Sequence, residues 1–416
     1  MEAKTEKNKP LEKVYVIQPI LSDNYKVLHE EAISLIQSID AVYVGTTYQA
    51  VREINPATFI GTGKLEEIRE FLSGLEDITV LFNGELSPSQ TLNISAMLEN
   101  RKVIDRTTLI LDIFAKHARS SEGKIQVELA QLKYLYPRLK GKGEALSRLG
   151  GGIGTRGPGE TQLETDRRHI RTRISFLENA LHELEQRRTF QTERRKKNNA
   201  KTIALIGYTN TGKSTLMNLL TGADVLVKDA LFATLDPTAR SFTIEDADFV
   251  LMDTVGFLQE LPHNLIEAFH STLEAAVCAD LALIVCDAQG EYAMQLETTL
   301  KTLQDLQFDK PYLVVMNKSE NLDFDAVDAM PKDCIYISAK ENKGIENLKR
   351  RILDAFRKDF IFCTLSVPYA ELREYTARKS VLKERTVRYT DDGAEIRCVI
   401  PAYYGNQFEK WMLRMH

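Results

Sequence analysis

Short apolar runs alternate with amphipathic stretches of helical spacing through the first hundred residues of the chain. Apolar runs favour buried strands, and apolar residues three and four apart favour helices that pack on them. Because the two kinds of element alternate, we predict a small, largely parallel α/β domain at residues 13–118, after a disordered tail at residues 1–12. The expected strands are 14–17, 41–44, 78–82 and 102–104, and the expected helices are 28–39, 66–72 and 87–98.

The period changes in residues 119–200, where apolar positions step by four and three. One series runs from Ile125 to Leu139 and a second from Leu163 to Leu184. Such heptad seams predict two helices that pair as an antiparallel hairpin, which we call the arm. The glycine-rich residues 140–143 and 149–159 lie between the seams, so we expect them to form a loop at the tip of the arm.

Two further regions follow the arm. Residues 201–358 have the pattern of a doubly wound α/β domain, and residues 361–416 that of a small α+β domain, with a hairpin turn at residues 390–393. In the first region the expected strands are 202–206, 241–245, 249–252, 281–286, 312–316 and 334–337, and the expected helices are 214–221, 265–277, 295–306 and 344–356. In the second the expected strands are 361–367, 383–389 and 395–400, and the expected helices are 369–378 and 403–412.

Composition narrows the class of protein. With 416 residues and 43% apolar residues the chain is long enough for several folded domains. No run approaches the roughly 20 apolar residues of a membrane span, and the start has no apolar segment typical of a secretory signal. The five scattered cysteines argue against disulfides and zinc. We expect a cytoplasmic monomer without stable membrane insertion, and peripheral membrane association stays open.

Charge is unevenly distributed along the chain. The net charge is −5, but residues 116–201 hold 20 Lys and Arg against 10 Asp and Glu, so the rest carries −15. A basic region in an acidic protein is a candidate contact with a polyanion.

One nine-residue stretch has the pattern G-x-x-x-x-G-K-[ST], between an apolar run and a helix-like run. That context is typical of a phosphate-binding loop. Backbone N–H groups would surround the phosphates, Lys213 would reach the β- and γ-phosphates, and Ser214 would bind Mg²⁺. A glycine turn with an incidental Lys-Ser pair is the structural alternative. The candidate nucleotide-binding residues are Gly207, Tyr208, Thr209, Asn210, Thr211, Gly212, Lys213, Ser214 and Thr215.

Two segments downstream fit a nucleotide switch. Asp253 ends an apolar run, where its carboxylate would hold Mg²⁺, and Gly256 would donate its N–H to the γ-phosphate. Before it, Thr234 is our choice for the second metal hydroxyl and Thr238 is the rival. We expect Lys213, Thr234 and Gly256 to act in catalysis, and Ser214, Thr234 and Asp253 to bind the metal. The candidate nucleotide contacts here are Phe232, Ala233, Thr234, Leu235, Asp236, Asp253, Thr254, Val255 and Gly256.

Two later loops follow predicted parallel strands and would lie beside the base of the nucleotide. Ligands bind at the carboxyl ends of strands in sheets of this kind. The candidate residues are Asn317, Lys318, Ser319, Glu320, Ser338, Ala339 and Lys340.

The arm carries the basic region, which favours structured RNA as a partner. The contacts would be to the RNA backbone and would not read the base sequence. A flexible linker is the alternative for the tip. The second basic cluster, at residues 194–197, is either a further contact or the solvated end of a helix. Residues 61–64 resemble a shortened phosphate loop, which is either a helix cap or a second anion site. The candidate RNA-binding residues are Arg148, Gly150, Gly151, Gly152, Gly154, Arg156, Gly157, Gly159, Arg167 and Arg168.

The phosphate loop, the candidate switch threonine and the D-x-x-G, N-K-x-[DE] and S-A-K motifs occur in the order of translation-factor-like GTPases. Within these, the chain resembles the HflX family of ribosome-associated GTPases. The resemblance rests on the glycine-rich tip with the residues E-T-Q-L-E-T-D-R-R after it, on F-A-T-L-D-P at 232–237, on D-T-V-G-F at 253–257, and on V-I-D-R-T and I-L-D-I-F at 103–107 and 110–114.

The resemblance implies an α/β protein whose P-loop GTPase domain follows the α/β domain and the arm and precedes the small α+β domain. It further implies that the protein hydrolyses GTP, binds the large ribosomal subunit and its RNA, and separates stalled or idle ribosomes. Some members of the family also accept ATP and act on RNA.

Three residues refine this expectation. Glu320 stands where the base-reading motif usually has Asp, so we expect GTP over ATP with weaker discrimination. Phe257 stands where many GTPases have a water-orienting Gln, which implies slow hydrolysis stimulated by a partner. Asn210 resembles the Asn of relatives that K⁺ activates, so K⁺ is a candidate activator beside Mg²⁺. The alternatives are an ATP-dependent RNA-remodelling enzyme and a non-catalytic, nucleotide-gated RNA-binding module.

Overall fold

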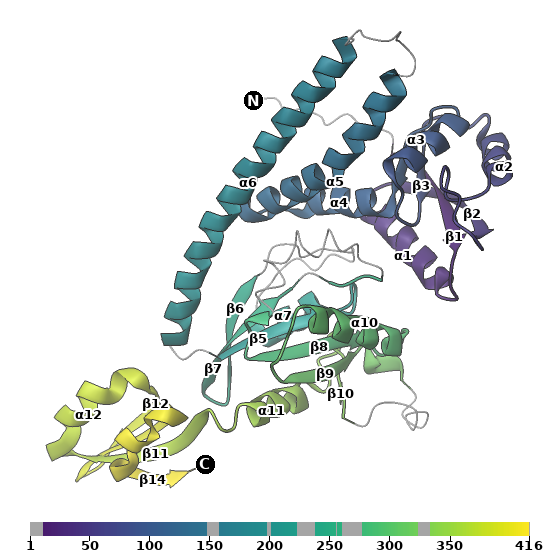
Figure 1. Cartoon of the computed structure of the whole chain (residues 1–416). Helices are drawn as coiled ribbons and strands as arrows, with labels where there is room; N and C mark the ends of the chain where they lie inside the picture. Colours follow the sequence, from purple (N-terminus) through teal and green to yellow (C-terminus); the bar gives the residue numbers. More distant parts are fainter. Residues whose placement is uncertain are drawn as a thin grey trace, which may run out of the picture. The chain divides into compact units, whose positions relative to one another are not determined.

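The computed structural model contains two compact units, one built on the chain up to Arg187 and one on most of the chain after it (Figure 1). The described residues form three β-sheets, one in the first unit and two in the second. The structure describes residues 11–147, 158–197, 201–222, 238–254, 256–259, 277–322 and 333–415.

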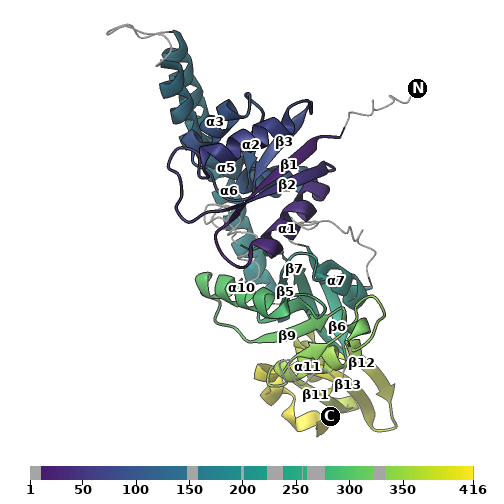
Figure 2. The same cartoon turned by 90° about the vertical axis from the view of Figure 1, so that its right-hand side faces the viewer.

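The first unit begins with a four-stranded parallel sheet of order β2-β1-β3-β4. Helices α2 and α3 lie on one face and α1 on the other (Figure 2). The predicted parallel α/β fold is therefore confirmed, although the sequence analysis did not predict α4. The elements are β1 (Lys13–Ile20), α1 (Tyr25–Ser38), β2 (Val42–Ala50), α2 (Thr62–Leu72), β3 (Ile78–Phe82), α3 (Pro88–Met97), β4 (Val103–Asp105) and α4 (Arg106–His117).

Local capping explains where two of these helices begin. Ser87 accepts a hydrogen bond from the Gln90 N–H while Gln90 caps Ser87 in return, a reciprocal capping box. Gly61 is the N-cap of α2, and Lys64 pairs with Glu67 one turn along the same helix. Residues 61–64 therefore form the capped start of a helix, which is the first of the two alternatives given for this segment.

The arm is an antiparallel pair of helices, α5 (Ser121–Ser147) and α6 (Pro158–Lys197) (Figure 1). Arg173 makes two hydrogen bonds to Glu128, and Lys133 lies 2.8 Å from Glu178, so ion pairs join the two helices. The prediction of a hairpin is confirmed.

The limits of its loop were wrong. Residues 140–143 continue α5, since each of the two glycines there costs the helix only about 1 kcal/mol. At the other end, α6 begins with Pro158, a residue favoured in the first turn of a helix. The loop is therefore shorter than the glycine content suggested.

The second unit begins with a six-stranded sheet of order β10-β9-β8-β5-β7-β6, in which only β6 runs antiparallel to its neighbour. Helices α7 and α11 share one hydrophobic core with the sheet, and α10 packs on β8 and β5. Of the predicted helix at 265–277, only residue 277 is described. The elements are β5 (Lys201–Gly207), α7 (Lys213–Thr221), β6 (Ala239–Ile244), β7 (Ala247–Asp253), β8 (Leu281–Asp287), α10 (Tyr292–Asp305), β9 (Tyr312–Asn317), β10 (Ile335–Tyr336) and α11 (Ile345–Ala355).

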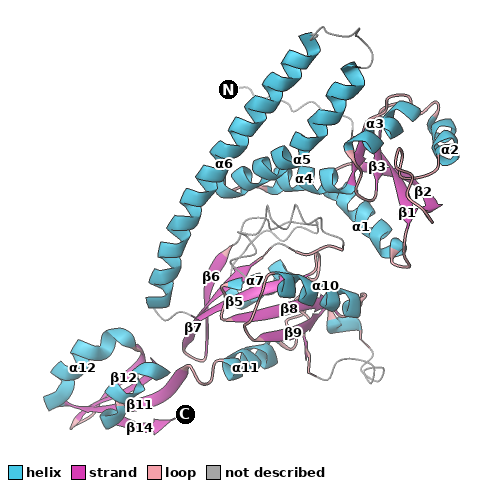
Figure 3. Ribbon diagram, viewed as in Figure 1, coloured by secondary structure: helices cyan, strands magenta, loops and turns pink. Residues whose placement is uncertain are grey.

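The C-terminal part is an antiparallel sheet of order β12-β13-β11-β14 with one short helix, α12 (Figure 3). The helix predicted at residues 403–412 was wrong. Two 3₁₀ turns and a strand occupy the segment, because Phe408 and Trp411 are both buried at a spacing of three, the period of a 3₁₀ turn. The elements are β11 (Phe360–Pro368), α12 (Leu372–Arg378), β12 (Lys383–Tyr389), β13 (Gly393–Pro401), the turns η5 (Ala402–Gln407) and η6 (Glu409–Trp411), and β14 (Met412–Met415).

Among the described helices, none combines the length and the apolar character that crossing a membrane requires.

Candidate nucleotide-binding site

The loop between β5 and α7 wraps tightly around the start of the helix. Gly207 has a φ of +150°, and a Cβ there would lie 2.2 Å from the carbonyl oxygen of Val285. Gly212 has a φ of +88°, and a Cβ there would lie 2.3 Å from Nδ2 of Asn317. Both positions therefore require glycine. Helix α7 starts at the next residue, so its free N–H groups face the space that the loop encloses, a favourable place for an anion.

Lys213 lies inside this loop. Its ammonium donates to the carbonyl oxygens of Gly207 and Tyr208 at 3.0 and 2.6 Å. Burial lowers the pKa of Lys213 to about 8. The negative charge of Asp253 raises this pKa, but by less than burial lowers it. Among the described residues, two backbone oxygens thus accept from the ammonium, and a phosphate placed beside it would stabilise its charged form.

Ser214 and Asp253 form the candidate metal site. The Ser214 hydroxyl donates to Oδ2 of Asp253 at 3.0 Å. Mg²⁺ prefers oxygen ligands and takes one or two from the protein, with water and nucleotide phosphates completing its shell. A hydroxyl and a carboxylate side by side therefore fit Mg²⁺. The ion would neutralise phosphate charge there.

The D-x-x-G segment lies against the phosphate loop. Phe257 donates its N–H to Gly207 and accepts from the N–H of Thr209, at 3.0 and 2.8 Å. A Cβ on Gly256 would lie 2.8 Å from Cγ2 of Thr209 and 3.0 Å from the Lys213 ammonium. Gly256 is therefore close to the atoms that would meet a γ-phosphate. The ring of Phe257 is buried and offers no hydrogen bond to a water.

Asn317 ties the base-reading loop to its neighbours. Its Nδ2 donates to the carbonyl of Thr211 at 2.8 Å, and its Oδ1 accepts from the N–H of Ala339 at 3.0 Å. One amide thus fixes the phosphate loop relative to the S-A-K loop. Lys318 has a φ of +62°, and its ammonium lies 2.6 Å from Oδ2 of Asp287. Ser319 donates its N–H to the carbonyl of Ile337.

Glu320 lies beside Ser338. A hydrogen bond from the Ser338 side chain lowers the pKa of Glu320, so its carboxylate is charged at neutral pH. Its Oε2 is buried without a hydrogen-bond donor among the described residues. A buried acceptor of this kind suits the N–H donors on the edge of guanine. Lys340 is exposed at the end of the same loop.

Some candidates lie outside the described residues: Phe232, Ala233, Thr234, Leu235, Asp236 and Val255. The rival switch threonine is described, and the Thr238 hydroxyl contacts Sδ of Met217 at 3.6 Å. Because Met217 belongs to the hydrophobic core, Thr238 is a poor metal ligand here. Thr234 therefore stays our prediction.

Of the candidate RNA-binding residues, too, some are described by the structure and others are not. Arg148, Gly150, Gly151, Gly152, Gly154, Arg156 and Gly157 lie outside the described residues, and Gly159 lies in the first turn of α6. Arg168 is exposed, while the Arg167 guanidinium is 5.5 Å from the centre of the Tyr136 ring. Arg167 therefore contacts the other helix of the arm, a packing role that spacing alone did not suggest.

The sequence analysis missed Asp287. Its carboxylate holds Lys318, and its N–H donates to the side chain of Gln295 at 2.9 Å. Its position at the end of an apolar strand is the signal that could have indicated this residue. In the structure Asp287 pairs in register with Asn317. Polar residues at the carboxyl ends of neighbouring parallel strands meet at one edge.

Three successive parts of this chain match models of known protein families. Residues 27–115 match the family model described as GTP-binding GTPase N-terminal, and residues 117–195 match the GTP-binding GTPase Middle Region. Residues 202–318 match the model described as 50S ribosome-binding GTPase.

The chain is 45% identical to the GTPase HflX of Caldanaerobacter subterraneus subsp. tengcongensis, over 94% of this chain and 92% of the relative. It is 41% identical to the GTPase HflX of Escherichia coli K12, over 83% and 82%. This chain belongs to the HflX family of GTPases. As an HflX-family protein it binds GTP and GDP and hydrolyses GTP.

Among solved structures, a GTP-binding protein from the archaeon Sulfolobus solfataricus in complex with GDP is similar to this HflX-family chain. It shows 25% identity and a TM-score of 0.46, and the match covers 83% of this chain and 98% of that one.

Proposed function

We propose that this HflX-family GTPase binds the large ribosomal subunit in its GTP state and separates stalled or idle ribosomes in the cytoplasm. The observation that carries the proposal is the pair of backbone hydrogen bonds between the phosphate loop and Phe257. A γ-phosphate at Lys213 and Gly256 would act directly on the segment that continues from Phe257, as in nucleotide switches. The match to a model of 50S ribosome-binding GTPases supports the partner.

The arm is the proposed contact with ribosomal RNA. The basic region at residues 116–201, which includes the arm, has a surplus of ten positive charges that suits a phosphate-rich surface, and the glycine-rich tip suits close backbone approach. Arg168 is the described candidate whose side chain is exposed for such a contact. The residues of the tip itself stay predictions.

We further propose that hydrolysis is slow until the subunit binds. Phe257 offers no group that orients the attacking water, so another element has to supply one. Asn210 has a φ of +60° at the mouth of the phosphate loop and is the proposed holder of K⁺. We expect the protein to act as a monomer.

GTP hydrolysis by the full chain, measured with and without large ribosomal subunits in Na⁺ and in K⁺, tests this function. We expect the subunits to raise the rate by roughly tenfold or more. Deletion of residues 150–159 and the variant Arg168→Glu are expected to lower subunit binding, whereas Arg373→Glu, a charge reversal on α12, leaves it unchanged. No stimulation together with unchanged binding after the deletion would refute the proposal.

A second candidate function, an ATP-dependent RNA-remodelling enzyme, is favoured by one observation, the longer Glu320 in the base-reading loop. Competition between ATP and GTP for the full chain decides between them. We expect GTP to bind more tightly, and Glu320→Asp to widen the ratio by about tenfold. The control is Glu341→Asp, which shortens a neighbouring exposed carboxylate. A preference for ATP in the unchanged chain would reverse this ranking.

A further inference from the structure

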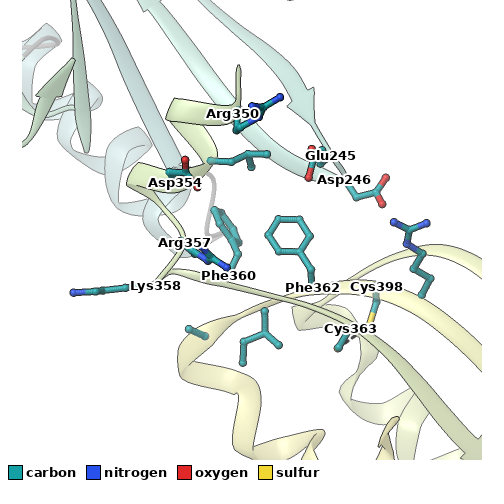
Figure 4. A pocket seen from close by; sticks show the side chains of 14 residues that line it. Glu245, Asp246, Arg350, Asp354, Arg357, Lys358, Phe360, Phe362, Cys363 and Cys398 are labelled. Atoms are coloured by element: carbon teal, nitrogen blue, oxygen red, sulfur yellow. Dashed lines mark hydrogen bonds between the residues drawn. The ribbon is translucent and has the colours of Figure 1, made fainter. Parts of the chain in front are cut away.

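A cavity of about 620 Å³ opens in the second unit and shares no lining residue with the nucleotide-binding site. The turn between β6 and β7 and the end of α11 line it on one side, and strands β11 and β13 on the other (Figure 4). Ligand pockets typically measure about 300–1,000 Å³, so the space suits a small ligand or one group of a larger one. The nucleotide chemistry described above makes no use of it.

Two aromatic side chains of one strand form part of the lining. Phe360 and Phe362 are two residues apart on β11, so they lie on the same face of the C-terminal sheet, and both rings point into the cavity. The ring centres are 6.5 Å apart with an angle of 61° between the planes, and both rings are only partly buried against the core of the six-stranded sheet. A planar group can therefore stack on the part of the rings that stays exposed.

Four cationic side chains also line the cavity, and none of them forms an ion pair with any residue that the structure describes. They come from both sides of the cavity, so a group stacked on the two rings would have cations on either side of it. Figure 4 shows Lys358 pointing away from the rings, where it would meet a part of the ligand outside the cavity. The cations are Arg350 on α11, Arg357 and Lys358 in the turn after it, and Arg397 on β13.

The carboxylates of the lining narrow the class of anion that fits. Asp246 lies 3.5 Å from Arg385, a cation outside the lining, which leaves Glu245 and Asp354 against the four cations. The cavity therefore favours an anion, but these two carboxylates would repel an acidic peptide. They would attract a nucleobase, because its amino group can donate a hydrogen bond to a carboxylate while its phosphates meet the cations.

We propose that this cavity binds an unpaired nucleotide within a single strand of RNA. The base stacks on Phe360 and Phe362, and the phosphates on its two sides meet Arg397 and the cations at the end of α11. Stacking of bases on aromatic side chains, with the backbone held by cations, is the usual way in which proteins bind single strands. The site belongs to the second unit and the arm to the first, so this inference goes beyond the function proposed above and can fail without it.

The first experiment measures, by fluorescence anisotropy, how tightly the full chain saturated with GDP binds a labelled RNA strand of about six nucleotides. Arg397→Glu should weaken binding about fivefold or more and flatten its salt dependence, because a phosphate contact is lost. Phe362→Leu keeps an apolar side chain without an aromatic face, and should weaken binding about fivefold without changing that dependence. The matched controls Arg373→Glu and Phe71→Leu change exposed residues outside the cavity and should change the affinity less than about twofold. Equal affinities of all four variants would overturn the proposal.

Photocrosslinking of the unchanged protein locates the strand and does not depend on whether a variant folds. A strand that carries 4-thiouridine should crosslink to the peptide that contains Phe360 and Phe362. Unlabelled strand should suppress this crosslink at least ~10-fold more effectively than a duplex of the same sequence, whose bases are paired, or than AMP, which lacks neighbouring phosphates. Crosslinks confined to the arm, equal competition by duplex or AMP, or displacement by a polyglutamate peptide would each overturn the proposal. Because no ribosome is present, such a failure leaves the proposed function untouched.

Discussion

The four-stranded parallel sheet and the largely parallel six-stranded sheet differ at the carboxyl ends of their strands. In the six-stranded sheet, the edge holds a glycine-rich loop whose Lys213 ammonium donates to two backbone oxygens. In the four-stranded sheet of the first unit, the edge holds side chains that hydrogen-bond to one another. Asn83 donates to Gln18 at 2.5 Å, and Arg106 donates to Asn83 at 2.9 Å and to Glu31 at 2.5 Å.

The difference shows what separates a binding edge from a structural one in the same architecture. Polar groups gather at the carboxyl ends of both sheets. Where they hydrogen-bond to one another, as around Arg106, removing one leaves its buried partners unsatisfied and destabilises the fold. Where a cation is held by carbonyl oxygens that a phosphate can replace, the edge is ready for an anion. Substitutions at the two edges should therefore affect different properties of the protein.

The largest effect is expected at the structural edge. Arg106→Met keeps most of the volume but leaves the Glu31 carboxylate and the Asn83 amide buried with one fewer partner. Breaking a buried ion pair costs about 3–5 kcal/mol, so the free energy of unfolding in urea should fall by that amount. The control is Lys102→Met, which removes an exposed ion pair to Glu12 worth less than about 1 kcal/mol. Equal effects of the two variants would mean that the Arg106 cluster is not structural.

At the binding edge, Gly207→Ala should cost about 3 kcal/mol or more, because the left-handed φ is strained and the new Cβ meets a carbonyl oxygen. The same change at Gly222 should cost only about 1 kcal/mol, because φ is also positive there but no atom of the described residues lies within 4 Å of the new Cβ. The melting curves of Gly207→Ala and Gly222→Ala are compared, and the affinity of each variant for GDP is measured. The difference between the variants separates the clash of the new Cβ from the strain of a positive φ. A Gly207→Ala protein as stable as Gly222→Ala would contradict the tight loop described above.

Much of this contrast could be predicted from the sequence, and some could not. The nucleotide loop has a local motif, so residues 207–215 were placed from spacing alone, and apolar runs predicted the strands that carry it. The cluster around Arg106 has no local pattern. Its members lie at residues 18, 31, 83 and 106, and only the parallel pairing of β1, β3 and β4 brings them together.

Helix ends and the last segment show the same limit. Glycines at 141 and 143 favour a loop, but α5 continues through them, because the helix penalty of each is only about 1 kcal/mol. In the C-terminal segment, helical spacing was compatible with either an α-helix or 3₁₀ turns, and the burial of Phe408 and Trp411 against the small sheet decided between them. Tertiary contacts, which the sequence does not display, therefore decide the structure of the last segment.

The next effect concerns pH. The pKa of Lys213 is lowered to about 8 in the folded, ligand-free chain, so the unfolded chain binds more protons between pH 8 and about 10.4. The contribution of Lys213 to stability therefore rises with pH across that window. A bound triphosphate favours the charged form, so binding takes up a proton above pH 8. Affinity for GTP should consequently fall about tenfold per pH unit there.

Titration of the protein with GTP at pH 7, 8 and 9 measures this loss. The same titration of Lys213→Met is the control, because ionisation of the guanine base affects both proteins and cancels in their ratio. The ratio of the two affinities should shrink as pH rises. A constant ratio would mean that the ammonium stays charged in the free loop and that the carbonyl contacts hold it more firmly than burial weakens it.

The smallest expected effect concerns residues 61–64 of the first unit. This segment resembles a shortened phosphate loop and is the candidate second anion site. A Cβ on Gly63 would have no atom within 4 Å, and the residue lies in α2 without a left-handed φ. Gly63→Ala should therefore raise the free energy of unfolding by about 0.5 kcal/mol through helix propensity. Gly74→Ala, just after the same helix and at a φ of +85°, should lower it by about 1 kcal/mol. If Gly63→Ala instead weakened binding of an anion such as pyrophosphate, the segment would be a second cradle and the contrast between the two edges would fail.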